Sequence, residues 1–168
     1  MYQAFLIKYA EIEKKKKNRY IFEDALVEHI RRALKKVEGN FRVTKEQGRI
    51  YAFPEEAYDF EETVEALKRV FGIAAICPVV VTEDQGYEKL AEAVVGYVQK
   101  VYPASTRSFK VHARRARKSY PMDSMELNRE LGGAILAACP GMRVDVHQPD
   151  IWLTVEVRQK IYIYSEEI

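Results

Sequence analysis

FRVTKEQGRIYAF, residues 41–53, contains two short β-rich runs, FRVTK and RIYAF, joined by the link EQG. A link of this length that offers Gly48 for a backbone with positive φ is typical of a β-hairpin. Outward from this hairpin, the chain shows one helical pattern on each side, and beyond each helix another β-rich run, AFLIKYA at the start and IAAICPVVV later. The expected order is strand, helix, strand, strand, helix, strand.

The helix before the hairpin is indicated by apolar residues at three- and four-residue spacing between Phe22 and Val37. His29 falls within this apolar pattern, so we expect it in the core or at its boundary. Asn18 is the expected N-cap, and Gly39 is the expected stop.

The helix after the hairpin begins at DFEE, residues 59–62, which has the form of a capping box. Gly72 is the expected end of this helix. We expect the helix to bury Phe60, Val64, Leu67 and Phe71. Two helices on one face of an antiparallel sheet in this order form the split βαβ, or ferredoxin-like, motif, and we assign it to residues 1–80.

The second half, residues 81–168, predicts helix, strand, helix and then three strands, an α/β domain of its own. Its first helix lies in GYEKLAEAVVGYVQKVY, and its first strand begins at Phe109. Asp123 is the expected N-cap of the second helix, with Glu126 as its capping-box partner. Gly132 and Gly133 lie inside that helix, and we expect them to mark a site of close packing. The fold class is therefore α+β.

Positive charge is segregated along the chain, although 27 basic and 25 acidic residues leave a net charge of only +2. Residues 107–119 hold six basic residues and no acid, and residues 14–19 hold five basic residues and no acid. Two acid-free basic clusters are typical of a surface that binds a polyanion.

The loop at residues 114–119 lies between a predicted strand and the start of a predicted helix. Arginine offers a planar set of five donors that matches phosphate oxygens, and a helix N-terminus adds free backbone N–H groups. Ser119 would add a hydroxyl group and Tyr120 a ring on which a base can stack. This pattern predicts a phosphate-binding loop.

Catalytic and metal-binding patterns are absent from the sequence. No two histidines have metal-ligand spacing, and no glycine-rich phosphate loop or Ser/His/Asp pattern is found. Cys77 and Cys139 lie in apolar surroundings without C-x-x-C spacing, so we expect two buried, reduced thiols. No apolar run approaches the length of a membrane span. We expect a cytoplasmic protein without a cofactor or a metal.

Three stretches resemble the tRNA 4-thiouridine synthetase family. Residues 9–34 resemble the segment in which E-I-x-L-K-G-x-N-R precedes the first helix, although this chain reads EIEKKKKNR. Residues 109–136 carry an R-R-x-x-K-S-[FY]-P signature like that of the THUMP domain. Residues 144–168 resemble its closing strands, with P-D-[IV]-x-L-x-V-E-[IV]-R and a final Y-x-Y.

This resemblance implies a ferredoxin-like domain followed by a THUMP domain that binds the 3′ acceptor end of tRNA. Members of the family continue into a PP-loop domain that forms 4-thiouridine with a sulfur donor protein, and the family is also linked to thiamine biosynthesis. The sequence given ends at Ile168, where that domain would begin, so we expect this chain to lack it and to have no catalytic activity alone. The catalytic domain is sometimes that of a partner subunit, which would make the chain a homodimer.

The residues carried over by motif as contacts to the RNA end are Arg114, Arg115, Lys118, Ser119 and Tyr120. Arg117 joins them by proximity only, Asn128 and Arg129 by their place in the first turns of the following helix, and Arg158, at the end of its strand, is a weaker candidate. The residues expected to meet the backbone of the stem are Lys16, Lys17, Asn18 and Arg19.

Two other functions remain open from the sequence. The basic faces would also suit a regulatory module that binds an acidic protein partner. Small ferredoxin-like enzymes can hydrolyse acyl phosphates with one arginine and one asparagine, a role open to Arg19 or Arg42 with Asn18 or Asn40, by analogy of fold alone.

Overall fold

The computed structural model describes residues 1–9, 18–46 and 48–168. They form two compact units, one of Met1–Val79 with Glu166–Ile168 and one of Val80–Ser165.

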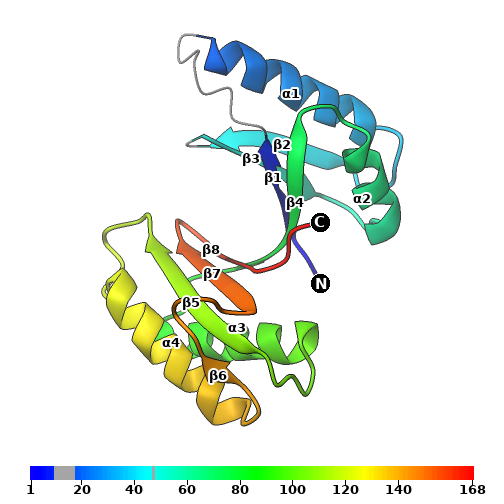
Figure 1. Cartoon of the computed structure of the whole chain (residues 1–168). Helices are drawn as coiled ribbons and strands as arrows, with labels where there is room; N and C mark the ends of the chain where they lie inside the picture. Colours follow the sequence, from blue (N-terminus) through cyan, green and yellow to red (C-terminus); the bar gives the residue numbers. More distant parts are fainter. Residues whose placement is uncertain (10–17, 47) are drawn as a thin grey trace. The chain divides into compact units, whose positions relative to one another are not determined.

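The first unit is a four-stranded antiparallel sheet with both helices on one face (Figure 1). Its elements are β1 (Ala4–Tyr9), α1 (Arg19–Leu34), β2 (Phe41–Glu46), β3 (Arg49–Pro54), α2 (Phe60–Lys68) and β4 (Ile73–Thr82). The strand order is β2-β3-β1-β4. The hairpin of β2 and β3 closes with Glu46 opposite Arg49, and Gly48 has φ +77°. The predicted ferredoxin-like motif is confirmed.

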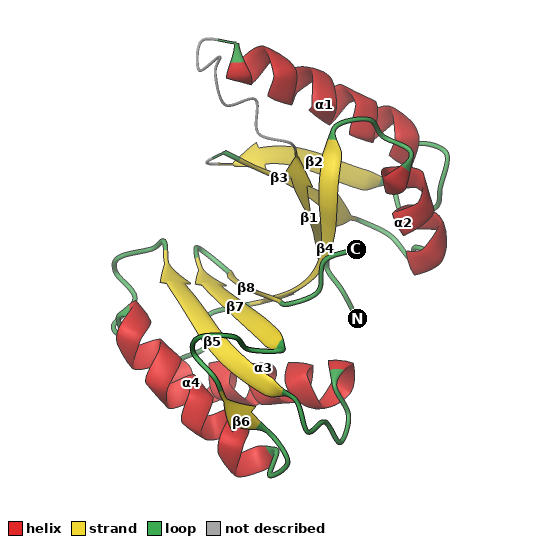
Figure 2. Cartoon of the chain, in the orientation of Figure 1, coloured by secondary structure: helices red, strands yellow, loops and turns green. Residues whose placement is uncertain are grey.

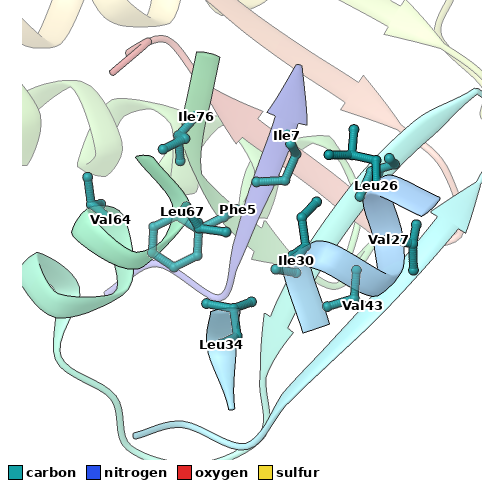
Figure 3. Packing of buried hydrophobic residues seen from close by; sticks show 12 residues of the cluster. Phe5, Ile7, Leu26, Val27, Ile30, Leu34, Val43, Val64, Leu67 and Ile76 are labelled. Atoms are coloured by element: carbon teal, nitrogen blue, oxygen red, sulfur yellow. The ribbon is translucent and has the colours of Figure 1, made fainter. Parts of the chain in front are cut away.

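The core of this unit lies between the helices and the sheet (Figure 3). α1 contributes a stripe at the expected helical spacing, and Leu26, Ile30 and Leu34 are buried. Leu67 of α2 and Phe5 of β1 are fully buried beside them. Burial of each such side chain contributes about 1.5–3 kcal/mol, so this interface holds the unit together.

Asn18 stands at the N-cap position of α1 as predicted, although its side chain makes no capping hydrogen bond. Two other expectations about the helices are wrong. His29 is exposed, because the buried stripe runs through its neighbours Leu26 and Ile30. α2 ends at Lys68, so Phe71 lies beyond the helix and is 93% exposed.

The second unit is a mixed sheet with α3 (Tyr87–Val101) and α4 (Ser124–Ala138) on one face (Figure 2). Its strands are β5 (Ser108–Arg115), β6 (Arg143–Val144), β7 (Ile151–Val157) and β8 (Ile161–Tyr164), together with the end of β4. The order is β4-β8-β7-β5-β6, in which β5 runs parallel to both β7 and β6. The predicted order of helices and strands is confirmed.

The start of α4 is capped as predicted, because the Asp123 carboxylate accepts a hydrogen bond from the Glu126 amide at 2.8 Å. The prediction for the glycine pair in α4 is wrong. A Cβ added to Gly132 or Gly133 would meet no atom within 4 Å, so neither glycine is required by close packing.

Candidate nucleic-acid interface

Side chains of α4 accept hydrogen bonds from backbone amides near the C-terminal end of β5. The Ala113 amide donates to Asn128 Oδ1 at 2.7 Å, and the Arg115 amide donates to Ser124 Oγ at 3.3 Å. Asn128 therefore holds the helix to the strand. These hydrogen bonds fix the first turns of α4 against the last residues of β5.

Arg117 is committed to the protein. Its guanidinium forms an ion pair with Asp84, donates from Nε to the Arg158 carbonyl at 2.8 Å and donates to Ser119 Oγ at 3.2 Å. Its backbone amide also donates to the Val157 carbonyl at 2.9 Å. Arg117 therefore anchors the loop to the end of β7, and its charge is largely neutralised.

Three other predicted residues also serve the fold. Arg115 is half-buried and donates to the Tyr120 carbonyl at 3.1 Å, which closes the loop. Tyr120 is only 2% exposed, so the expectation that its ring stacks on a base is wrong. Burial raises the pKa of the Tyr120 hydroxyl. Arg158 is paired with the buried Glu156 at 2.9 Å and is also a packing residue.

Arg114, Lys118 and Arg129 remain available on the surface. All three are exposed, and within the described part of the chain none forms an ion pair. Charges of this kind are free to meet phosphate groups. In the basic loop, Arg115 and Arg117 thus stabilise the conformation, whereas Arg114 and Lys118 are exposed to a ligand.

A second set of side chains, which we call the strand-face cluster, consists of Lys110, His112, Arg114 and Trp152. The Lys110 ammonium lies 4.5 Å from the centre of the Trp152 ring, and the His112 ring lies 5.3 Å from it. Trp152 is 47% exposed. Parallel pairing of β5 with β7 sets Lys110 opposite Trp152 and brings these side chains together.

Sequence reasoning did not assign Trp152 to the interface. The available signal was alternation, since Lys110, His112 and Arg114 alternate with buried residues of β5, as Trp152 does in β7. Which strands are neighbours was not readable from that pattern. Burial, and then the nearby charges of Arg114 and Lys110, lower the pKa of His112, so its imidazole is neutral at pH 7.

An open groove of about 550 Å³ lies between β5, β6 and α4. Lys110 and Arg129 are the charged residues of its lining. Its other lining residues are mainly apolar and include the exposed side chains Met125, Leu136, Val144 and Val146. The strand edge therefore offers a surface that is cationic and partly apolar.

The residues expected to meet the backbone of the stem belong to the first unit, and the structure describes two of these four. Lys16 and Lys17 lie outside the described residues. Asn18 and Arg19 are exposed, and Arg19 Nε lies 3.6 Å from the carboxylate of Glu23, which also accepts from the Tyr9 hydroxyl. Burial, and then the hydrogen bond to Glu23, raise the pKa of Tyr9.

The geometry does not favour the small-enzyme alternative. Arg42 lies over the Phe53 ring at 4.4 Å and 3.9 Å from the Glu55 carboxylate, and Arg19 faces Glu23. Both arginines considered for acyl phosphate chemistry therefore have carboxylate neighbours.

The described residues contain no cluster of three metal-ligating side chains, and none of their helices is long and apolar enough to cross a membrane. Burial raises the pKa of the Cys77 thiol to about 11, which keeps it protonated and unreactive at neutral pH. Cys139 was expected to be buried, but it is half-buried.

Comparison with known proteins identifies both halves of the chain. Residues 4–77 match the ThiI ferredoxin-like domain, and residues 85–166 match the THUMP domain. The chain therefore consists of a ThiI ferredoxin-like domain followed by a THUMP domain. The exposed residues Arg114, Lys118 and Trp152 thus lie in its THUMP domain.

Relatives and solved structures agree with this assignment. The chain is 55% identical over its full length to a probable tRNA sulfurtransferase of Agathobacter rectalis and 56% identical to that of Lachnospira eligens, and it spans 43% of each. It superposes with a TM-score of 0.81 and 29% identity on a 4-thiouridine synthetase solved with RNA and ATP, covering all of this chain and 42% of that one. The corresponding values for PH1313 of Pyrococcus horikoshii are 0.78 and 30%, covering 99% of this chain and 54% of that one.

Proposed function

We propose that this chain binds tRNA as the RNA-holding part of a machinery that forms 4-thiouridine. The family supports the class of ligand, because the relatives are named as tRNA sulfurtransferases and a similar structure contains RNA. The observation that carries the proposal is that the same domain presents two unpaired cations, Arg114 and Lys118, and the exposed ring of Trp152.

The single-stranded 3′ end is the part of tRNA that fits this surface best. Proteins contact double-stranded RNA mainly at phosphates and 2′-hydroxyls, whereas unpaired bases can stack on aromatic rings. Trp152, with Lys110 at its face and neutral His112 at its side, offers such a ring. One stacked base contributes about 1–3 kcal/mol. Arg114 and Lys118 would hold the adjoining phosphates.

In this proposal, the chemical steps of 4-thiouridine formation take place in another part of the machinery. Cys77 is a buried, protonated thiol in the ferredoxin-like domain, and Cys139 lies in the THUMP domain. A PP-loop domain would activate the uridine and a sulfur donor protein would supply the sulfur. The chain would position the RNA for these steps in the cytoplasm.

The test uses an acceptor-stem RNA with a single-stranded 3′ overhang and the same stem with a blunt end. Trp152→Ala should weaken binding of the overhang RNA about fivefold or more and leave the blunt stem unchanged, because a ring serves only an unpaired base. Trp152→Phe should restore most of the loss. Equal effects on both RNAs would contradict recognition of the 3′ end.

Arg114→Ala combined with Lys118→Ala should weaken both RNAs, with Lys89→Ala as the matched control on α3. Lys89 is 62% exposed, and its ammonium is paired with Glu92, whereas Arg114 and Lys118 have no such partner in the ranges that the structure describes. If the double variant binds RNA as well as wild type does, RNA binding by the loop is excluded. Displacement of RNA by an acidic protein at these same residues would favour the regulatory alternative.

A further inference from the structure

Phe71, in the first unit, is left on the surface by the end of α2. It is 93% exposed, more than any other large apolar residue described. Folding gains nothing from an aromatic ring in this position, and such exposure is often a mark of a binding surface when other apolar atoms adjoin it.

The ring stands at a pocket between α1 and the end of α2. The pocket has a volume of about 360 Å³. α1 contributes residues at three- and four-residue spacing, so one stripe of that helix faces the pocket. The apolar part of the lining consists of Ala33, Val37, Ala66, Val70 and Phe71, and the basic part consists of His29, Arg32, Lys36 and Arg69.

The basic residues of this pocket are not neutralised by the protein. Elsewhere on the two helices, Arg31 pairs with Glu28, and Lys68 pairs with Glu65. Those ion pairs involve residues outside the lining. All four basic residues of the lining are exposed, and over the described ranges none of them has an ion-pair partner.

We propose that this pocket, which we call the α1–α2 pocket, binds an acidic segment of a partner protein through one bulky apolar side chain. An apolar floor surrounded by charged groups is the usual arrangement of a protein–protein hot spot, in which an anchor is buried and the rim is polar. Arg32, Lys36 and Arg69 would pair with carboxylates of the segment, and Phe71 would pack against its apolar residue.

A protein segment fits these observations better than a second RNA contact. The apolar lining other than Phe71 is aliphatic, namely Ala33, Val37, Ala66 and Val70, and such side chains neither pair with phosphates nor offer a flat ring to a base. The carboxylates and apolar side chains of an acidic segment match both parts of the lining. This proposal does not depend on RNA binding by the THUMP domain.

The probe is a fluorescein-labelled twelve-residue peptide of glutamate and aspartate with one central phenylalanine. Its binding to the full chain is followed by fluorescence anisotropy at low salt. Arg32→Glu should weaken binding about fivefold or more, since an attraction becomes a repulsion. Phe71→Ala should weaken it about threefold or more, and a peptide with alanine in place of phenylalanine should bind wild-type protein equally weakly.

Lys35→Glu is the matched control, because Lys35 is exposed at the C-cap of α1 and does not line the pocket. It makes the same change in net charge and should have less than about a twofold effect. Equal losses for Lys35→Glu and Arg32→Glu would reduce the binding to net charge and overturn the proposal. Absence of peptide binding to wild type, or an unchanged affinity in Phe71→Ala, would also overturn it.

RNA serves as the second arm of the experiment. Arg32→Glu should bind the acceptor-stem RNA as wild type does, whereas Arg114→Ala combined with Lys118→Ala should bind it more weakly. Loss of RNA binding in Arg32→Glu would make the pocket an RNA contact and refute the protein segment. If the loop variant binds RNA as wild type does, only the proposed function is refuted, and the proposal for the α1–α2 pocket is unaffected.

Discussion

Tyr120 illustrates how far the role of one residue depends on its surroundings. It lies in an arginine-rich loop, but its ring is buried, and its hydroxyl has no hydrogen-bond partner among the residues that the structure describes. Arg117, three residues earlier, lies 5.6 Å from the centre of that ring and pairs with Asp84. At the residue scale, some of the cations in this loop stabilise the conformation of the loop and are not available to a ligand.

Removal of the Tyr120 hydroxyl should therefore not destabilise the protein. A buried donor without a partner costs about 1–3 kcal/mol, so Tyr120→Phe should leave the melting temperature unchanged or raise it. Tyr58→Phe is the control, because the Tyr58 hydroxyl donates to the Tyr2 carbonyl at 2.7 Å. That variant should lose about 1 kcal/mol of unfolding free energy. A larger loss for Tyr120→Phe than for Tyr58→Phe would show that the hydroxyl has a partner.

At the scale of elements, two positions show where the backbone requires a glycine and where it does not. Gly39 precedes β2 with φ +131°, and a Cβ there would lie 2.5 Å from the Phe41 ring and 2.9 Å from the Tyr58 Cβ. Gly133 lies within α4 and would meet nothing. The first glycine permits a turn, whereas the second only weakens a helix.

Alanine substitutions should move stability in opposite directions at these two positions. Gly39→Ala should lower the free energy of unfolding by roughly 2 kcal/mol or more, through backbone strain and overlap with Phe41. Gly133→Ala should raise it by about 0.5–1 kcal/mol, because alanine is the better helix former. Urea unfolding of both variants measures the difference. A stabilised Gly39→Ala protein would mean that the turn before β2 does not require a glycine.

At the scale of the whole molecule, the distribution of charge matters more than its sum. The net charge is +2, yet the THUMP domain presents Arg114 and Lys118 unpaired, and the ferredoxin-like domain presents the α1–α2 pocket. In each case nearby cations are paired with carboxylates, as Arg117 is with Asp84. Local pairing leaves cationic surfaces on a protein with little excess charge.

The salt dependence of RNA binding should report how many of these cations meet phosphates. For each phosphate neutralised, the slope of log K against log salt concentration steepens by about 0.7–0.9. Arg114→Ala combined with Lys118→Ala should therefore reduce the slope by about 1.4–1.8. Lys89→Ala should leave it unchanged. The same slope in wild type and in the double variant would exclude phosphate contacts by these two residues.

The sequence by itself determined the elements and their order. Apolar periodicity, the cap at Asp59 and the glycine of the hairpin act within a few residues, so the positions of α1, α2 and the β2–β3 hairpin were predictable. The same local signals predicted α3, β5, α4 and the closing strands. They also identified the charged loop from which the candidate site is partly built.

Only the tertiary structure decided which charges are free and which rings are exposed. Arg117 meets Asp84 and the Arg158 carbonyl, 33 and 41 residues away, and Trp152 meets Lys110 because β5 and β7 are neighbours. Tyr120 turned inward and Phe71 outward for the same reason, since exposure depends on what packs from distant parts of the chain. Local patterns act over a few residues, whereas ion pairing and burial are set by contacts between segments that folding brings together.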